Sequence, residues 1–175
     1  MSVYKNILDA IKSQLQTYVT LTGVNGTDSI RDEAIVIRTP RYNSDSRSHE
    51  WYASEETPGI LIIPGRRVRR PPGEGNNCQD DVHYPVMIQI VDRSQQRYDE
   101  DKVASWLLWH ENIAKYFNHN NLRNAVFDTS GYVNRVTLPD HDFDDPQRFL
   151  LHDLCVSYLF LDVVSREPRN SNGLV

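Results

Sequence analysis

Apolar residues recur at steps of three or four positions in two segments of the chain, which is the spacing of one face of an α-helix. The first segment follows Ser2, a residue type that favours the position just before a helix, and the glycines of Thr22-Gly23 and Asn25-Gly26 are typical of its end. Its apolar positions are Tyr4, Ile7, Leu8, Ile11, Leu15 and Tyr18. We therefore predict an N-terminal amphipathic helix with one buried face.

The second helical segment is the more regular of the two. Acidic residues 99–101 occupy its first turn, where the helix dipole favours negative charge, and the polar run 118–121 ends it. Its predicted buried stripe consists of Val103, Trp106, Leu107, His110, Ile113, Ala114 and Phe117. On this stripe His110 is interpreted as a hydrogen-bonded core or interface histidine. At about 20 residues the helix would be roughly 30 Å long and could cover one face of a small sheet.

Short apolar runs bounded by turn residues predict strands. These runs are 34–38 (AIVIR), 60–63 (ILII), 84–91 (YPVMIQIV), 132–138 (YVNRVTL) and 150–164 (LLHDLCVSYLFLDVV). Because Pro85 cannot donate a ladder hydrogen bond, we expect it at the start of its strand or at a sheet edge. The last run is apolar on both faces in its second half, which predicts a central strand or one covered by a neighbouring subunit.

These elements together predict an α+β fold with a single, mainly antiparallel sheet. The N-terminal helix and the long second helix are expected to pack on that sheet, and an extended hairpin and loops complete the fold. Residues 1–165 would form one domain. Residues 166–175 have no pattern and predict a flexible C-terminal tail.

The composition narrows the class of protein. The chain has 175 residues, of which 39% are hydrophobic and 25% charged, and this suits one globular domain. A formal net charge of −5 argues against a general nucleic-acid binder. Cys78 and Cys155 form neither a metal pattern nor a disulfide framework, and without a secretory segment we expect a reducing cytoplasm. No apolar run approaches the roughly 20 residues that cross a bilayer, so no membrane partner is expected.

The acidic turn at 140–145 is the strongest candidate for metal chemistry. Its carboxylates, Asp140, Asp142, Asp144 and Asp145, resemble the start of a calcium-binding loop. The loop lacks the required glycine and the distant bidentate glutamate, and Pro146 interrupts it, so we interpret it as a solvated turn. The six histidines have no zinc spacing, and the chain has neither a nucleophile elbow nor a phosphate loop. We therefore predict no catalytic residue, no metal and no cofactor.

An arginine cluster lies at the tip of the predicted hairpin, just before Pro71-Pro72-Gly73. It consists of Arg66, Arg67, Arg69 and Arg70. These charges could simply discourage edge-to-edge pairing of strands. They could instead contact an acidic partner surface or passing nucleic acid, and the acidity of the rest of the chain favours a protein partner.

The order of helix, strand, arginine-bearing hairpin, long helix and two closing strands resembles the tail terminator (tail completion) proteins of long-tailed bacteriophages. The resemblance covers residues 3–165. Its carriers are YKNILDAIKSQL, YPVMIQIVDR, DKVASWLLWHENIAKYF, VNRVTLPD and LLHDLCVSYLFLDVV. It implies a non-enzymatic subunit of a hexameric ring that caps the tail tube, stops its polymerisation and docks the head, while DNA passes through the lumen without specific binding.

The resemblance also implies partners and a location. The ring would contact the tail tube protein, the sheath if the tail is contractile, and the head–tail connector or stopper. It would assemble in the host cytoplasm and remain in the virion neck. Between subunits, we expect the arginine cluster to meet the acidic turn of the next copy, which makes assembly sensitive to salt.

Three other readings stay open. The long polar loop 40–57 and the arginine hairpin exceed what a minimal tail terminator needs, which leaves room for a head–tail adaptor or a stopper. A monomeric or dimeric binding module outside a virion is the second. The third is a metal-dependent nuclease or hydrolase that uses the acidic turn at 140–145.

Overall fold

The computed structural model describes residues 2–26, 28–38, 57–65, 68, 75–76, 79–93, 100–119, 121–122, 132–139 and 154–168. The described helical elements are α1 (Val3–Tyr18), the short 3₁₀-helix η1 (Asp32–Ala34) and α3 (Glu100–Asn118). The strands are β1 (Ile35–Ile37), β2 (Gly59–Pro64), β3 (Gly75–Asn76), β4 (Gln79–Arg93), β5 (Tyr132–Thr137) and β6 (Leu154–Pro168).

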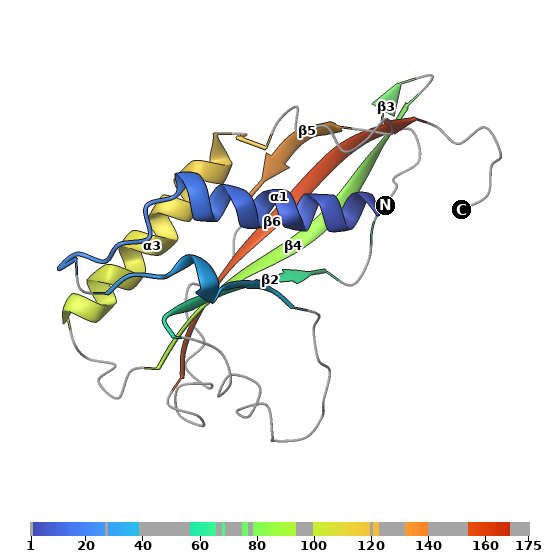
Figure 1. The fold of residues 1–175 in the computed structure, drawn as a ribbon. Helices are drawn as coiled ribbons and strands as arrows, with labels where there is room; N and C mark the ends of the chain where they lie inside the picture. Colours follow the sequence, from blue (N-terminus) through green and yellow to red (C-terminus); the bar gives the residue numbers. More distant parts are fainter. Residues whose placement is uncertain are drawn as a thin grey trace.

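The strands form one mixed sheet in the order β1-β2-β4-β6-β5, and the two-residue β3 pairs with the beginning of β4. The β1–β2 pair is parallel, while β2–β4, β3–β4, β4–β6 and β5–β6 are antiparallel. Figure 1 shows α1 and α3 lying across the same face of this sheet. The predicted α+β class, with a mainly antiparallel sheet and two helices, is confirmed.

The centre of the sheet is a long ladder between β4 and β6. It runs without interruption from the pair Gln79–Pro168 to the pair Arg93–Leu154. Because β6 lies between β4 and β5, the prediction of a central strand is confirmed. The strand continues through Pro168, however, so the prediction that the loose tail begins at residue 166 was wrong for residues 166–168. Residues 169–175 lie outside the described residues.

The hydrophobic core fills the space between the helices and the sheet. Every second residue of a strand points towards the helices, because successive side chains of a pleated strand point to opposite faces of the sheet. The largest fully buried side chains include Trp109, Phe117, Ile7, Ile11, Leu15, Ile60, Ile62, Ile88 and Ile90. The core therefore combines the predicted stripe of α1 with one face of β2 and β4.

The buried face of α3 differs from the predicted stripe. The buried residues are Ser105, Trp106, Trp109, Ile113 and Phe117, whereas Val103 and Leu107 are 41% and 44% exposed. Trp106, Ile113 and Phe117 belong to both the predicted stripe and the observed buried face. The remaining residues therefore decide how α3 is rotated about its axis. Turning Trp109 inward buries a second tryptophan beside Trp106, and aromatic side chains bury more area than Val or Leu.

The end of the first helix also differs from the prediction. Helix α1 begins after Ser2 as predicted, but it ends at Tyr18, and Val19 already has an extended backbone. β-Branched residues such as Val19 favour that conformation. Further along, Thr22 forms an isolated antiparallel bridge with Ser29 instead of ending the helix.

Pro85 lies inside the central strand β4, not at its start or at an edge strand, so that prediction was wrong. The sheet tolerates it because β2 ends there: the last β2–β4 pair is Pro64–Val86. The Pro85 carbonyl accepts a hydrogen bond from the amide of Gly65 at 2.7 Å, so the missing amide hydrogen of Pro85 also faces the side where β2 stops. Gly65 comes so near that a Cβ atom there would lie 2.6 Å from Cγ of Pro85.

Candidate interaction surface

The residues predicted to form the interface lie outside the described part of the chain. They are Arg66, Arg67, Arg69 and Arg70 of the arginine cluster, and Asp140, Asp142, Asp144 and Asp145 of the acidic turn. Their proposed contact between copies therefore stays a prediction. The structure instead brings together residues on the sheet face that points away from α1 and α3.

Apolar side chains gather on this face, opposite α1 and α3, and we call them the sheet-face patch. Its members are Val36, Leu61, Ile63, Met87, Val91, Val156, Tyr158 and Phe160. Strand register sets the arrangement: Ile63 pairs with Met87, which pairs with Phe160, and these side chains form one row across β2, β4 and β6. A second row follows β1, β2 and β6 through Val36, Leu61 and Tyr158. Four neighbouring strands thus contribute to one surface.

Phe160 is the outermost member of the sheet-face patch, with 40% of its surface exposed. Its ring stacks on Tyr158, two residues earlier on the same face of β6, with centroids 6.5 Å apart and an interplanar angle of 17°. Met87 and Tyr158 are partly buried, while Leu61, Val91 and Val156 are buried. The buried members already lie in the interior of the chain, so Phe160 is the member of the patch with the largest surface left for a partner protein.

Charged residues continue the same face of β4, β6 and β5 beyond Phe160, and we call them the charged row. They are Asp81, His83, Arg135, Asp162 and Arg166. Nδ1 of His83 lies 2.7 Å from Oδ2 of Asp162, on the neighbouring strand. Arg135 is exposed on the adjacent strand β5, where it pairs with Val164 in register. The sheet face opposite α1 and α3 therefore has an apolar half and a charged half.

Asp81 and Arg166 form the most complete ion pair of the charged row. They stand directly opposite each other in the β4–β6 ladder. Nε of Arg166 lies 2.8 Å from Oδ1 of Asp81, and Nη2 lies 3.0 Å from Oδ2, which is the two-point geometry that a guanidinium favours with a carboxylate. These hydrogen bonds hold the pKa of Asp81 below its usual value, although burial acts in the opposite direction. The pair anchors the end of the ladder.

The opposite face of the same ladder end is also polar. Tyr84 donates a hydrogen bond of 2.5 Å to Oε1 of the buried Glu167. Tyr4 of α1 packs on Tyr84 with ring centroids 5.1 Å apart and donates hydrogen bonds to the carbonyl oxygens of Pro85 and Gly65. Burial raises the pKa of Tyr4 to about 12. These contacts fasten the beginning of α1 to the sheet.

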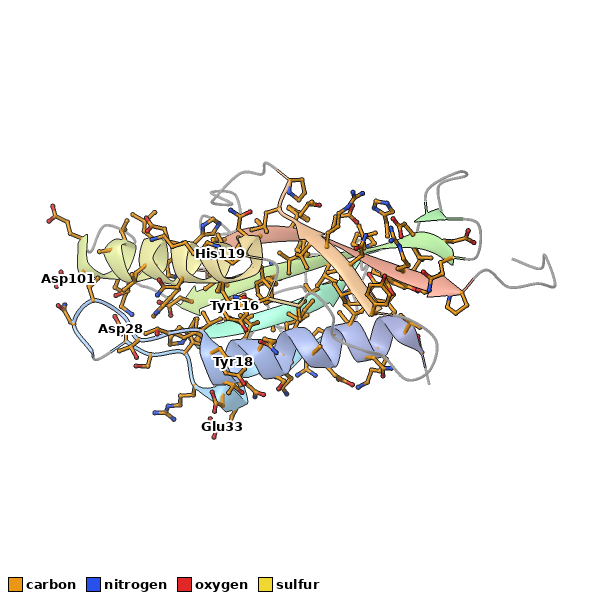
Figure 2. The ribbon with its side chains drawn as sticks, turned by 90° about the horizontal axis from the view of Figure 1, so that it is seen from above. Tyr18, Asp28, Glu33, Asp101, Tyr116 and His119 are labelled. Atoms are coloured by element: carbon orange, nitrogen blue, oxygen red, sulfur yellow. The ribbon has the colours of Figure 1, made fainter. Side chains whose placement is uncertain are left out.

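The helix layer carries a second exposed aromatic pair, formed by Tyr18 at the end of α1 and Tyr116 of α3. Their rings are nearly parallel, with centroids 6.4 Å apart and an interplanar angle of 6° (Figure 2). Tyr116 also donates a hydrogen bond to the side chain of Gln14, which fixes the pair between the two helices. Tyr18 is 65% exposed. We call these two residues the tyrosine pair.

Lys102 marks a third polar cluster, at the beginning of α3. Its Nζ lies 3.5 Å from Asp92 of β4 and 3.9 Å from Asp28 of the loop after α1. This cluster links three segments, which is a structural role. Among the described residues, no group of three His, Cys, Asp or Glu side chains could hold a metal ion.

Two further results concern function more broadly. Neither described helix is long and apolar enough to cross a membrane. Comparison of the chain with protein-family models and with characterised proteins finds no match. The function is therefore inferred from the geometry of the surfaces described above.

The sequence contained part of the signal for these surfaces. Successive residues of a strand alternate between its faces, so the sequence of β6 puts Val156, Tyr158 and Phe160 on one face and Leu159 and Leu161 on the other, and the structure agrees. Nε2 of His110 lies 3.3 Å from the carbonyl oxygen of Tyr158 and donates a hydrogen bond to it, so the prediction of a hydrogen-bonded histidine is confirmed. The tyrosine pair and the charged row had no sequence signal, because their members come from elements far apart in the chain.

Proposed function

We propose that this chain is a structural virion protein: one subunit of a ring-forming tail terminator at the head-proximal end of a phage tail. In this role it ends polymerisation of the tail tube and provides the surface on which the head docks. The observation that carries the proposal is Phe160, an aromatic side chain that is 40% exposed beside the charged row, on the face of the sheet opposite α1 and α3. Such a surface suits a protein whose work is assembly.

The physical support comes from the cost of apolar exposure. Burying apolar surface gains roughly 25 cal/mol per Å², so a partner that covers Phe160 and its partly buried neighbours gains free energy on docking. The charged row beside the patch supplies a polar border, which favours one orientation of the partner over others. A contact of this kind that joins unlike surfaces of successive copies closes into a ring when the rotation permits.

The net charge of −5 also suits the proposed role. An acidic wall repels the DNA that passes through the lumen, and the DNA can slide because it forms few lasting contacts. In this proposal the protein partners are the tail tube protein, the sheath if the tail is contractile, and the head–tail connector or stopper. The ring assembles in the host cytoplasm and is retained in the virion neck.

The test is a tail-tube assembly assay in vitro. Tube protein from the same phage is polymerised with and without the purified chain, and tube lengths and ends are measured in negative-stain images. We expect the chain to halt elongation and to form a ring at one end of each tube. Tubes that grow to the same lengths with bare ends would contradict a terminator, and rings bound to the head portal alone would assign the chain to the adaptor or stopper position.

A variant links the assay to the sheet-face patch. Replacing Phe160 with Asp places a charge on the most exposed residue of the sheet-face patch and should abolish the arrest of elongation. Replacing Lys5, which is exposed at the beginning of α1, with Glu is the matched control and should leave it unchanged. Both variants keep the core residues, so circular dichroism should show the same fold.

A further inference from the structure

The tyrosine pair lies at the end of α1, where negative potential from several sources meets an exposed aromatic surface. Tyr18 is the last residue of α1 and is 65% exposed, and its ring stacks on Tyr116 of α3. We infer that this site binds the guanidinium groups of Arg66 and Arg67 from a second copy of the chain. This inference rests on the proposed function, since it names a contact that would join successive subunits of the ring.

Carboxylates beside the tyrosine pair come from η1. Gln16 of α1 donates a 2.9 Å hydrogen bond to the carbonyl oxygen of Asp32, and this contact holds η1 against the end of α1. Asp32 and Glu33 are both exposed, and Figure 2 shows Glu33 at the same end of α1 as Tyr18. Arg31 precedes them in the chain and offsets one of the two charges. A net negative charge therefore remains beside the exposed ring.

The end of α1 adds to this negative potential. The carbonyl groups of its last turn carry the negative end of the helix dipole, and α1 has no basic residue in that turn to neutralise it. An arginine suits such a place better than a lysine, because its flat guanidinium stacks on an aromatic ring while its edge donates hydrogen bonds to carboxylate oxygens. The chemistry at the tyrosine pair is therefore that of a guanidinium site.

The arginine cluster follows the opposite end of α1. Tyr4 donates hydrogen bonds to the carbonyl oxygens of Gly65 and Pro85, so the residue before Arg66 is held beside the beginning of the helix. From Tyr4 to Tyr18 the helix rises roughly 21 Å. Two extended residues span at most about 7 Å, and the remaining distance of about 14 Å is longer than an arginine side chain. The first two arginines of the cluster therefore cannot reach the tyrosine pair of their own chain.

A second copy is the occupant that the charges and the distances favour. Its arginine cluster presents four guanidinium groups, and Val68 at the centre of the cluster is 46% exposed. Because the arginines and the tyrosine pair belong to opposite ends of α1, a copy that binds one neighbour through its arginines still offers its tyrosine pair to another. Repeated contacts of this kind build a row of subunits, which closes into a ring when the rotation between them permits.

Cysteine cross-linking between separately prepared copies tests this contact. The chain first receives Cys78→Ser and Cys155→Ser, so that it has no other thiol. One preparation then carries Thr17→Cys, in the last turn of α1, and another carries Val68→Cys, in the arginine cluster. After the two are mixed at high concentration with a short bis-maleimide, we expect a linked dimer in the mixture and none in either preparation alone. Leu107→Cys, exposed on α3, is the control and should give no link with Val68→Cys.

A chain that carries both new cysteines separates this inference from the proposed function. We expect a ladder of linked oligomers, because each copy would bind two neighbours. A link that forms within one chain at high dilution would overturn the inference, and so would the absence of the mixed link. Rings seen on tube ends without the mixed link would overturn it while leaving the tail terminator role intact. A ladder that stops at the dimer, or a mixed link in a protein that never affects tube growth, would support the contact and contradict the role.

Variants of the site and of the cluster provide a second readout, the self-association constant in analytical ultracentrifugation. Tyr18→Ala should weaken association about two- to fivefold, the scale of one exposed cation–π contact, and Glu33→Gln about threefold, the scale of one exposed ion pair. Arg66→Lys combined with Arg67→Lys should also weaken it, although the charge is kept, because an ammonium group lacks the flat guanidinium. Lys5→Ser removes a charge from the same end of α1 and should leave association unchanged.

Two results in this assay would overturn the inference. One is a Tyr18→Ala variant that associates as strongly as wild type. The other is an association that is lost when the four aspartates of the acidic turn are changed to Asn and that is indifferent to Glu33→Gln. That second result would assign the arginines to the acidic turn of the next copy.

Discussion

The pair formed by Asp81 and Arg166 gives the sharpest test of the fold, because the sequence alone places Arg166 in a loose tail. The perturbation is Arg166→Met, which keeps the apolar stem and removes the guanidinium. In the structure that guanidinium forms two hydrogen bonds of 2.8 and 3.0 Å with Asp81. The side chain of Asp81 is only 9% exposed, while that of Arg166 is 25% exposed.

The magnitude follows from this burial. Removing one partner of a fully buried ion pair costs about 3–5 kcal/mol, because the remaining charge has lost its compensation. Water reaches part of the Arg166 side chain, so we expect the lower end, about 2–3 kcal/mol of unfolding free energy. For a chain of this size, 1 kcal/mol corresponds to about 2–4 °C, so the melting temperature should fall by roughly 4–12 °C.

The assay is urea unfolding followed by circular dichroism, at one fixed protein concentration because self-association adds to apparent stability. Lys115→Met is the matched control, because the Lys115 side chain is 70% exposed on α3, away from Asp81. It should change the free energy of unfolding by less than about 0.5 kcal/mol, as ordinary surface substitutions do. An Arg166→Met variant as stable as wild type would refute the reasoning and return residues 166–168 to a loose tail.

The same pair predicts a pH dependence with a definite sign. The pKa of Asp81 is lower in the folded chain than its ordinary value of 3.8, chiefly because of the hydrogen bonds from Arg166. The folded state therefore holds the proton less readily than the unfolded state, and the stabilisation is complete only above pH 3.8. The stability difference between wild type and Arg166→Met should shrink as the pH falls below 3.8 through the folded-state pKa.

Two further predictions concern the helix face and the close approach at the end of β2. Ile113→Ser should cost about 3 kcal/mol because that side chain is fully buried, whereas Leu107→Ser should cost less than about 1 kcal/mol; equal losses in urea unfolding would show that α3 is rotated as the sequence suggested. Gly65→Ala should destabilise the fold by about 1–3 kcal/mol because the new Cβ would overlap Pro85, and an unchanged unfolding midpoint would contradict that packing.

The periodic segments show how far local patterns reach. The stripe Ile7, Leu8, Ile11 and Leu15 is buried as its spacing predicts, because a helix with one apolar stripe has only one favourable way to face a core. Helix α3 has apolar residues on more than one side, so its spacing fits two rotations. The choice between them depended on the space under Trp109, which only the packed sheet defines.

The candidate surfaces show the same division. Alternation along β6 determined which side chains share a face, since successive residues of a strand point to opposite sides. It could not determine which face the helices cover, and that choice left Phe160 exposed while burying Leu159. The tyrosine pair joins residues on separate helices, a neighbour relation that no local pattern contains.

By itself, then, the sequence determined the α+β class, the first helix and the alternation of the faces of β6, because each follows from the local period of apolar residues. Tertiary structure decided the rotation of α3, the place of Pro85 beside the end of β2, and the extension of β6 through Arg166 to Pro168. Those features depend on which strands lie side by side and how far each one runs. Contacts between distant segments set both, and such contacts have no periodic trace in the chain.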